Sequence, residues 1–186
     1  MLNTGNRSMI KAAVDALDLS PGTTAADVGF GGGIGIQLLA DAVGDNGRVH
    51  GIDQSDLAVT KARQTHAAAI ASGRIMIHQA SMTAIPIDSA SIDGAISTNT
   101  VYFLDDEALS MALTEFARVL APAGRLSLGI SDPGAMEHNP LLEHGFTNRS
   151  IDALESAAGM AGLRLAGQSR SGSRDHSPHV LVFEKA

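Results

Sequence analysis

The stretch that decides the fold is ADVGFGGGIGIQLLADAVG, residues 26–44. Its glycines gather at Gly29, Gly31, Gly32, Gly33 and Gly35. Glycine at this density weakens helices and strands, so the backbone here must turn, or approach a neighbour, in a way that side chains would prevent. Apolar residues on both sides predict a strand over 24–30 and a helix over 34–43. The sequence therefore predicts a tight strand–turn–helix unit with bare backbone at the turn.

Helices and strands alternate along the rest of the chain. The pattern predicts helices over 6–18, 55–71, 105–120 and 150–161. It predicts further strands over 48–53, 74–80, 91–98, 124–130, 163–169 and 179–185. Strands separated by helices of this length form right-handed crossovers and a mostly parallel sheet covered on both faces. Only the polar loop 170–178 separates the last two strands, which is too short for a crossover helix, so we expect them to pair antiparallel.

These elements indicate one α/β domain over residues 1–186. The expected fold is Rossmann-like and doubly wound, with a mostly parallel seven-stranded sheet and an antiparallel C-terminal strand. Two segments stand apart from the regular pattern, a helical N-terminal segment at 1–20 and a long irregular connection at 131–149. Long connections are commonly functional, so we expect 131–149 to line the site.

Composition narrows the class of partner. The chain has 13 Lys and Arg against 20 Asp and Glu, a net charge of −7, which disfavours nucleic acid as a partner. It has no cysteine, which removes disulfides and thiolate chemistry and favours a reducing cytoplasm. No apolar run resembles a secretory signal or a membrane span. We therefore expect a cytoplasmic protein that acts on a small molecule, with neither nucleic acid nor membrane as partner.

A carboxylate follows the glycine turn at an informative distance. Asp53 ends the second predicted strand, 20 residues beyond Gly33. At this place in an open α/β sheet, an acid accepts hydrogen bonds from ribose hydroxyls. The glycine turn and Asp53 together predict a cofactor that contains a nucleoside.

A nicotinamide cofactor is one alternative. The fingerprint G-x-G-x-x-G fails from either Gly29 or Gly31, but the short-chain dehydrogenase variant G-x-x-x-G-x-G matches from Gly29 to Gly35. That family needs a catalytic Tyr-x-x-x-Lys, and the only tyrosine, Tyr102, is followed four residues later by Asp106. An NAD(P)-dependent oxidoreductase therefore remains the weaker alternative.

Another family matches more of the chain. DVGFGGG resembles the first motif of the class I S-adenosylmethionine-dependent methyltransferases, Asp/Glu-x-Gly-x-Gly-x-Gly. Its later segments are similar, in order, to GIDQS (51–55), QASMTAIPIDSASIDGAIS (79–97), NTVYFLDD (99–106) and EFARVLAPAGRLSL (115–128). Five segments thus match in register along nearly the whole chain. The chain is therefore identified as a member of this family, in the subgroup that methylates small molecules.

The resemblance implies S-adenosylmethionine as cofactor. It implies cofactor contacts at Asp27, Gly29, Gly31, Gly33, Asp53, Gln54, Ser81, Met82 and Asn99. Asp27 would accept from the ammonium group or orient the turn, and its alternative role is that of a helix-capping carboxylate. The family often has an acid where this chain has Ser81, so adenine would meet either the Ser81 hydroxyl or the backbone near Met82.

Methyl transfer is an in-line displacement, so a base is needed only where the acceptor must lose a proton, as a hydroxyl does. Our catalytic candidates are His144, oriented by Glu143, and Tyr102. The alternative for the histidine is a solvated surface residue. Glu137, His138, Glu143 and His144 could also hold a divalent metal, although their spacing matches no established motif, and we assign no metal ligand.

The expected function is methyl transfer to a small molecule, with a hydroxyl oxygen as the preferred acceptor atom. The aromatic content of 3% favours a polar acceptor such as a sugar or hydroxy acid. The alternatives are an N-methyltransferase of a small amine, the oxidoreductase, and a non-catalytic cofactor-binding partner domain. Residues 1–20 are too few for a full helical cap, and their amphipathic helix around Ile10 would either fold over the cofactor or pack against a dimer partner. The 131–149 loop or the second subunit of a homodimer would then complete the pocket.

Overall fold

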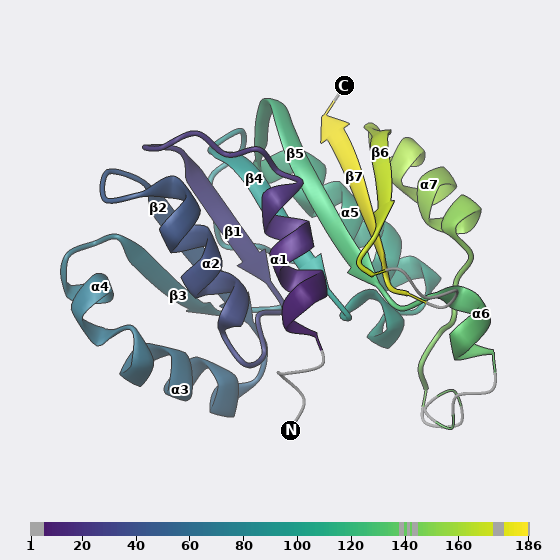
Figure 1. The fold of residues 1–186 in the computed structure, drawn as a ribbon, viewed down its shortest axis with the longest axis horizontal. Helices are drawn as coiled ribbons and strands as arrows, with labels where there is room; N and C mark the ends of the chain where they lie inside the picture. The colour runs from purple at the N-terminus through teal and green to yellow at the C-terminus, as the bar shows by residue number, and fades with distance from the viewer. Residues whose placement is uncertain (1–5, 138–139, 141, 143–144, 173–176, 186) are drawn as a thin grey trace.

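The computed structural model describes residues 6–137, 140, 142, 145–172 and 177–185. One seven-stranded sheet runs through it in the order β3-β2-β1-β4-β5-β7-β6 (Figure 1). Neighbouring strands are parallel except for β5–β7 and β6–β7. The strands are β1 (Thr24–Val28), β2 (Arg48–Asp53), β3 (Ile75–Gln79), β4 (Ile92–Thr98), β5 (Leu120–Ile130), β6 (Leu163–Arg170) and β7 (His179–Lys185). The expected fold class, including the antiparallel end of the sheet, is confirmed.

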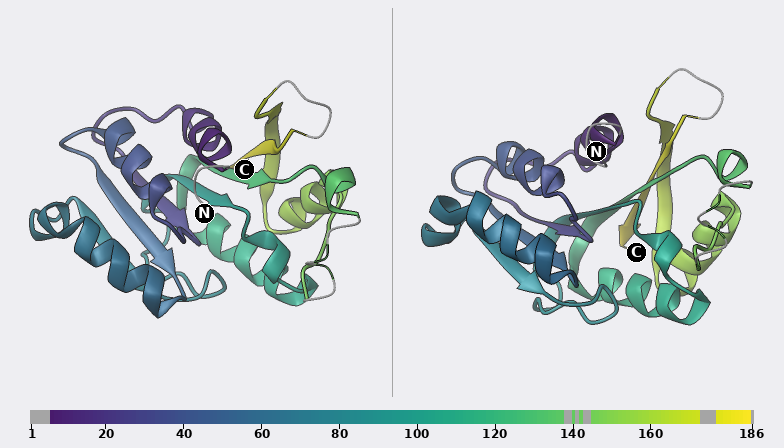
Figure 2. Two further views of the ribbon diagram at one scale, coloured as in Figure 1. Left: turned by 60° about the horizontal axis from the view of Figure 1, so that its bottom comes forward. Right: turned by 90° about the horizontal axis from the view of Figure 1, so that it is seen from below.

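Helices cover both faces of this sheet. One face packs against α1 (Arg7–Asp15), α2 (Ile34–Val43), α3 (Asp56–Thr65) and α4 (Ala67–Ala71). The other packs against α5 (Asp106–Val119) and α7 (Ile151–Met160). Figure 2 (right) shows α1 and α2 above the sheet and α5 below it. The short elements η1 (Val101–Phe103) and α6 (Pro133–Met136) follow β4 and β5 at the edge where the parallel strands end.

The structure corrects two predicted elements. The helix expected over 55–71 is divided at His66, whose φ of −106° leaves the helical range and whose imidazole is buried beneath the glycine turn. The strand expected from residue 124 begins at Leu120, because residues 121–124 bulge between the ladder pairs Ile92–Leu120 and Gly94–Arg125. Both irregularities involve residues far apart in sequence, His66 beside Gly33 and Leu120 beside Ile92, and local periodicity does not report such contacts.

No helix connects β3 to β4, and α5 anchors the connecting segment instead. The backbone N–H of Ile85 donates to Glu115 Oε2 at 2.7 Å. Arg118 donates in turn to the carbonyls of Ile85 (2.7 Å) and Ile87 (2.8 Å), and it is paired with Glu115. The pairing raises the pKa of Arg118, and the arginine lowers the pKa of Glu115. These bonds fix residues 85–87, just beyond the part of the segment that reaches the ligand edge.

The glycine turn joins the ends of three strands. The N–H of Gly29 donates to Ile52 O of β2 at 2.7 Å, and the N–H of Gly31 donates to Asp53 Oδ2 at 2.8 Å. Gly29 has a φ of +78°, and a Cβ on it would collide with Thr100 Cγ2, just past β4. Glycine is required at position 29 by both its dihedral angle and its neighbour.

Gly29→Ala should therefore destabilise the fold more than Gly31→Ala. Gly31 also has a positive φ, +48°, but a Cβ there would meet nothing within 4 Å. The left-handed conformation alone should lower the free energy of unfolding by about 1 kcal/mol in Gly31→Ala. The added collision should bring the loss in Gly29→Ala to about 2–4 kcal/mol, measured by urea denaturation. Combining it with Thr100→Ser, which removes Cγ2, should restore part of the loss; equal losses in the two alanine variants would contradict this account.

Candidate functional site

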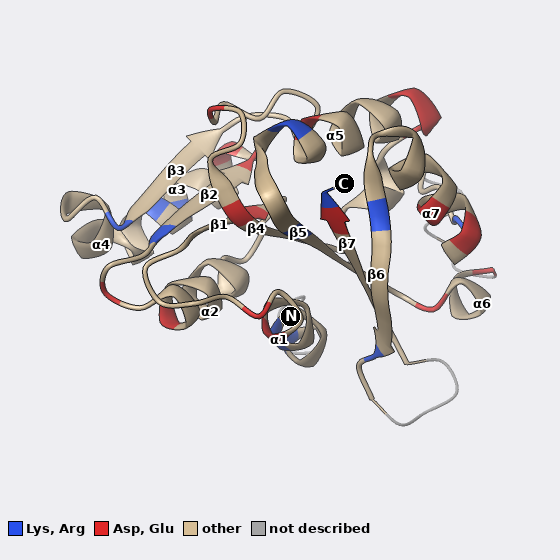
Figure 3. Cartoon of the chain, turned by 90° about the horizontal axis from the view of Figure 1, so that it is seen from above, with Lys and Arg blue, Asp and Glu red and all other residues tan. Residues whose placement is uncertain are grey.

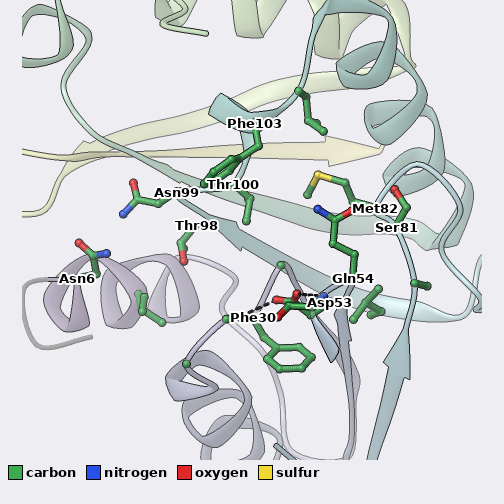
Figure 4. A pocket seen from close by; sticks show the side chains of 18 residues that line it. Asn6, Phe30, Asp53, Gln54, Ser81, Met82, Thr98, Asn99, Thr100 and Phe103 are labelled. Atoms are coloured by element: carbon green, nitrogen blue, oxygen red, sulfur yellow. Dashed lines mark hydrogen bonds between the residues drawn. The ribbon is translucent and has the colours of Figure 1, made fainter. Parts of the chain in front are cut away.

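A cavity of about 650 Å³ opens at the carboxyl ends of β1, β2 and β4 (Figure 4). The glycine turn forms its base, and the ends of β2 and β4 and the segment after β3 form its walls. Its volume is typical of small-molecule and cofactor sites. The predicted cofactor contacts that line it are Gly29, Gly31, Asp53, Gln54, Ser81, Met82 and Asn99. The sequence therefore located most of this site, although the roles of these residues stay predictions.

Asp53 is held with its carboxylate toward the cavity. Its Oδ2 accepts from the N–H of Gly31, and its Oδ1 accepts from the N–H of Ser55, both at 2.8 Å (Figure 4). A carboxylate oxygen has a second lone pair, so each can accept one more hydrogen bond. Fixed in this way, Asp53 is suited to bind two neighbouring hydroxyl groups.

Asn99 carries an unusual backbone and an unpaired oxygen. Its φ is +55°, and its N–H donates to Gly129 O at 2.9 Å. Its Oδ1 is buried with no hydrogen-bond partner in the described part of the chain. An unpaired buried acceptor is costly, and strained backbone of this kind gathers at functional sites. Asn99 therefore fits a ligand that brings a hydrogen-bond donor, as an amino group does.

Asp27 and Gly33 do not line the cavity. Gly33 lies behind the turn, in a smaller hollow between α2 and α3. Asp27 is 3% exposed, and its carboxylate accepts from the backbone N–H of Ile36 in the first turn of α2. Burial, with Asp53 nearby, raises the pKa of Asp27 to about 8. This placement agrees with the capping role that the sequence left open, while contact of Asp27 with the cofactor stays a prediction.

The outer wall of the cavity comes from η1 and from Leu104 after it. Phe103 and Leu104 line the cavity, whereas Tyr102 is 6% exposed and its hydroxyl accepts from the N–H of Ser131. Burial raises the pKa of Tyr102. The tyrosine therefore joins η1 to the exit of β5 and is not among the described residues that line the cavity, so its catalytic role stays a prediction.

Arg149 fixes this wall, and the sequence analysis missed it. Its side chain is 7% exposed, and it donates to the carbonyls of Val101 (3.0 Å) and Leu104 (2.7 Å). It also pairs with Asp106 at 2.9 Å, where α5 begins. The only local signal in the sequence is that Arg149 is the last residue of the irregular 131–149 connection. This signal does not distinguish an arginine that binds backbone carbonyls from one exposed at the surface.

The remaining catalytic candidates lie outside the described residues. They are Glu143 and His144, and His138, from the alternative metal set, lies outside as well. Glu137 is described and is exposed. Where the chain is described, no three His, Asp or Glu side chains converge as a metal site. The catalytic base therefore stays a prediction, and a divalent metal stays an open alternative.

The buried carboxyl predicts a pH dependence. Folding raises the pKa of Asp27 from its ordinary 3.8 to about 8, so the folded state keeps a proton that the unfolded state releases. Stability should fall as pH rises through this range, by at most about 1.4 kcal/mol per pH unit from this group. Asp27→Asn cannot ionise, so its free energy of unfolding in urea should depend less on pH between about 5 and 8. Parallel profiles for the two proteins would contradict the assignment.

Comparisons with known proteins agree with this geometry. A family model described as a methyltransferase domain matches residues 25–124. A 37.1 kDa protein in transposon TN4556 of Streptomyces fradiae is 37% identical over 126 residues, which are 68% of this chain and 35% of that protein. An O-methyltransferase of Pyrenophora dematioidea is 30% identical over 135 residues, 69% of this chain and 49% of that enzyme. The chain thus spans about a third to a half of the length of these relatives.

A solved structure extends the likeness to the whole fold. A SAM-dependent methyltransferase from Aquifex aeolicus superposes with a TM-score of 0.81 at 20% identity, covering 99% of this chain and 94% of that one. The family model spans the turn after β1, the end of β2 and the segments on which the cavity is built. The chain belongs to the class I S-adenosylmethionine-dependent methyltransferases.

Proposed function

We propose that this chain binds S-adenosylmethionine in the cavity and transfers its methyl group to a hydroxyl oxygen of a small molecule. The observation that carries the proposal is the cavity itself, where Asp53 and the unpaired Asn99 oxygen stand on either side of the glycine turn. The carboxylate suits the ribose hydroxyls and the amide oxygen suits the amino group. The bare backbone at Gly29 lets the exits of β1 and β4 approach each other closely at the base of the cavity.

Adenine would meet backbone and not the serine hydroxyl. The Ser81 Oγ and the Thr83 Oγ1 are 2.8 Å apart, and Ser81 Oγ also accepts from the N–H of Thr83 at 3.2 Å. These bonds engage the hydroxyl within its own turn. This supports the second alternative from the sequence, in which the backbone near Met82 recognises adenine and the Met82 side chain packs beside it.

The bound cofactor supplies an activated methyl group on a sulfonium. The chain's task is then to hold the acceptor oxygen in line with that methyl group and to accept a proton. We assign proton removal to His144, with Glu143 orienting it. A hydroxyl is favoured over an amine because a relative matched at 30% identity is an O-methyltransferase.

Surface features support a small acceptor. Figure 3 shows a few Lys and Arg segments near α3 and α4, single ones elsewhere, and acidic segments on α5 and α7. A polynucleotide needs an extended basic surface, and the chain carries a net charge of −7. Within the described residues, every helix is too short or too polar to cross a bilayer.

Asp53→Ala should weaken binding of S-adenosylhomocysteine at least roughly tenfold, because hydrogen bonds to a charged group contribute about 1.5–3 kcal/mol. Isothermal titration measures the affinity, and thermal unfolding shows whether the variant is folded. Asp53→Asn keeps one acceptor oxygen and should lose less. The control is Asp56→Ala, three residues away and exposed, which should bind as the wild type does. Unchanged affinity in Asp53→Ala would remove the ribose assignment.

His144→Ala should lower the rate of methyl transfer without changing the affinity for S-adenosylhomocysteine, because a base acts on the acceptor and not on the cofactor. The loss expected for a general base is roughly 100-fold or more in kcat. His138→Ala is the matched control from the same connection. Turnover that survives in His144→Ala, or that falls only in His138→Ala, would assign the proton to another group.

A further inference from the structure

The outer part of the cavity presents an aromatic ring to solvent. Phe103 lines the cavity and is nevertheless 62% exposed. Ile10, Met82 and Leu104 also line the cavity. Figure 4 shows Phe103 and Met82 around the same space as Asp53 and Gln54. An exposed apolar surface that continues a ligand cavity indicates a second, apolar ligand beside the first.

A second ring supports this one from the side, and Arg149 holds the backbone around it. The centroid of Phe103 lies 4.4 Å from that of Phe146, at an interplanar angle of 55°, and Phe146 also stacks on Tyr102. Arg149 binds the carbonyls of Val101 and Leu104, on either side of the ring in sequence. A ring fixed before binding loses little entropy when a ligand stacks on it.

The placement of aromatic residues reverses the expectation from composition. The chain has five phenylalanines and one tyrosine, and half of them, Tyr102, Phe103 and Phe146, gather at this wall. A low aromatic content favoured a sugar or hydroxy acid. The aromatic content is low in the rest of the chain and high at this wall.

The charges that line the cavity also disfavour a charged acceptor. Among the described lining residues the one ionisable side chain is Asp53, and its oxygens already accept from Gly31 and Ser55. None of these lining residues is a lysine or arginine that would balance a carboxylate or phosphate on the acceptor. At the outer wall, the hydroxyls of a sugar would face Met82, Phe103 and Leu104, which offer them no hydrogen bonds.

We infer that the acceptor is a flat, uncharged aromatic molecule bearing a hydroxyl, which stacks on Phe103 beside the cofactor. The inference rests on the proposed function. In the transfer, an oxygen lone pair forms the bond to the methyl carbon, the carbon–sulfur bond breaks, and its electron pair stays on sulfur as a neutral thioether. The aryl hydroxyl proton passes to the base assigned above or to water. An aryl hydroxyl resembles tyrosine, with a pKa of about 10, and needs a weaker base than an alkyl hydroxyl.

The test measures binding of 2-naphthol to protein saturated with S-adenosylhomocysteine, by isothermal titration. Decahydro-2-naphthol has the same hydroxyl on a saturated, non-planar frame, and methyl glucoside represents the polar acceptors. 2-Naphthol should bind more tightly than either, by about threefold to tenfold over the saturated alcohol, since stacking adds to area burial. Equal affinity for the saturated alcohol, or tighter binding of the glucoside, would overturn the inference.

Variants locate the ring. Phe103→Leu keeps an apolar side chain but removes the aromatic face, so it should weaken binding of 2-naphthol about threefold to tenfold and leave binding of decahydro-2-naphthol nearly unchanged. Met160→Leu, at a 79% exposed position on α7, is the control and should change neither. Phe103→Leu that binds both ligands as the wild type does would overturn the assignment of this ring.

Titration with S-adenosylhomocysteine alone separates the two claims. If it does not bind, the proposed function fails and the inference fails with it. If it binds but 2-naphthol shows no preference, only the acceptor class is wrong. In both Phe103→Leu and Met160→Leu the affinity for S-adenosylhomocysteine should stay within about twofold of the wild type, because neither residue is among the predicted cofactor contacts.

Discussion

The close approach of bare backbone at Gly29 to the Thr100 side chain is the constraint on which the rest of the site depends. It sets how near the exits of β1 and β4 come, and Asp53 at the end of β2 then binds the Gly31 N–H. Three strands are thereby joined at their carboxyl ends, and the cavity is what remains above them. A side chain at position 29 would separate the exits and widen the cavity that the cofactor has to fill.

The two walls above this base are held by arginines from outside the cavity. Arg118 holds the segment after β3, and Arg149 holds the turn after β4, each by donating to backbone carbonyls. Neither wall is a regular α-helix, so neither satisfies all its own carbonyls. A guanidinium can donate to several carbonyls at once. Because these bonds involve main-chain atoms, they fix the shape of the loops whatever side chains the loops carry.

The sequence was sufficient for the sheet, because each strand and helix carries its own period and the glycine turn and Asp53 lie at a fixed separation. It was not sufficient for contacts between distant residues. Phe103 and Phe146 meet across more than forty positions, and Arg149 reaches back to Val101. The positive φ of Asn99 and the break at His66 have the same origin, since tertiary neighbours impose both. Tyr102 is a different case: its motif made it a catalytic candidate, the structure buries it beside the cavity, and its catalytic role stays a prediction.

The position of β7 has a consequence for synthesis. It is the last strand of the sheet in sequence, yet it lies between β5 and β6, and Val180, Leu181 and Phe183 are fully buried. While the chain emerges from the ribosome, β5 has an open edge and the neighbouring core lacks these side chains. The parallel half, with the glycine turn, can assemble early, but the sheet closes only when residues 179–185 arrive. Until then the nascent domain exposes a strand edge of the kind that chaperones shield.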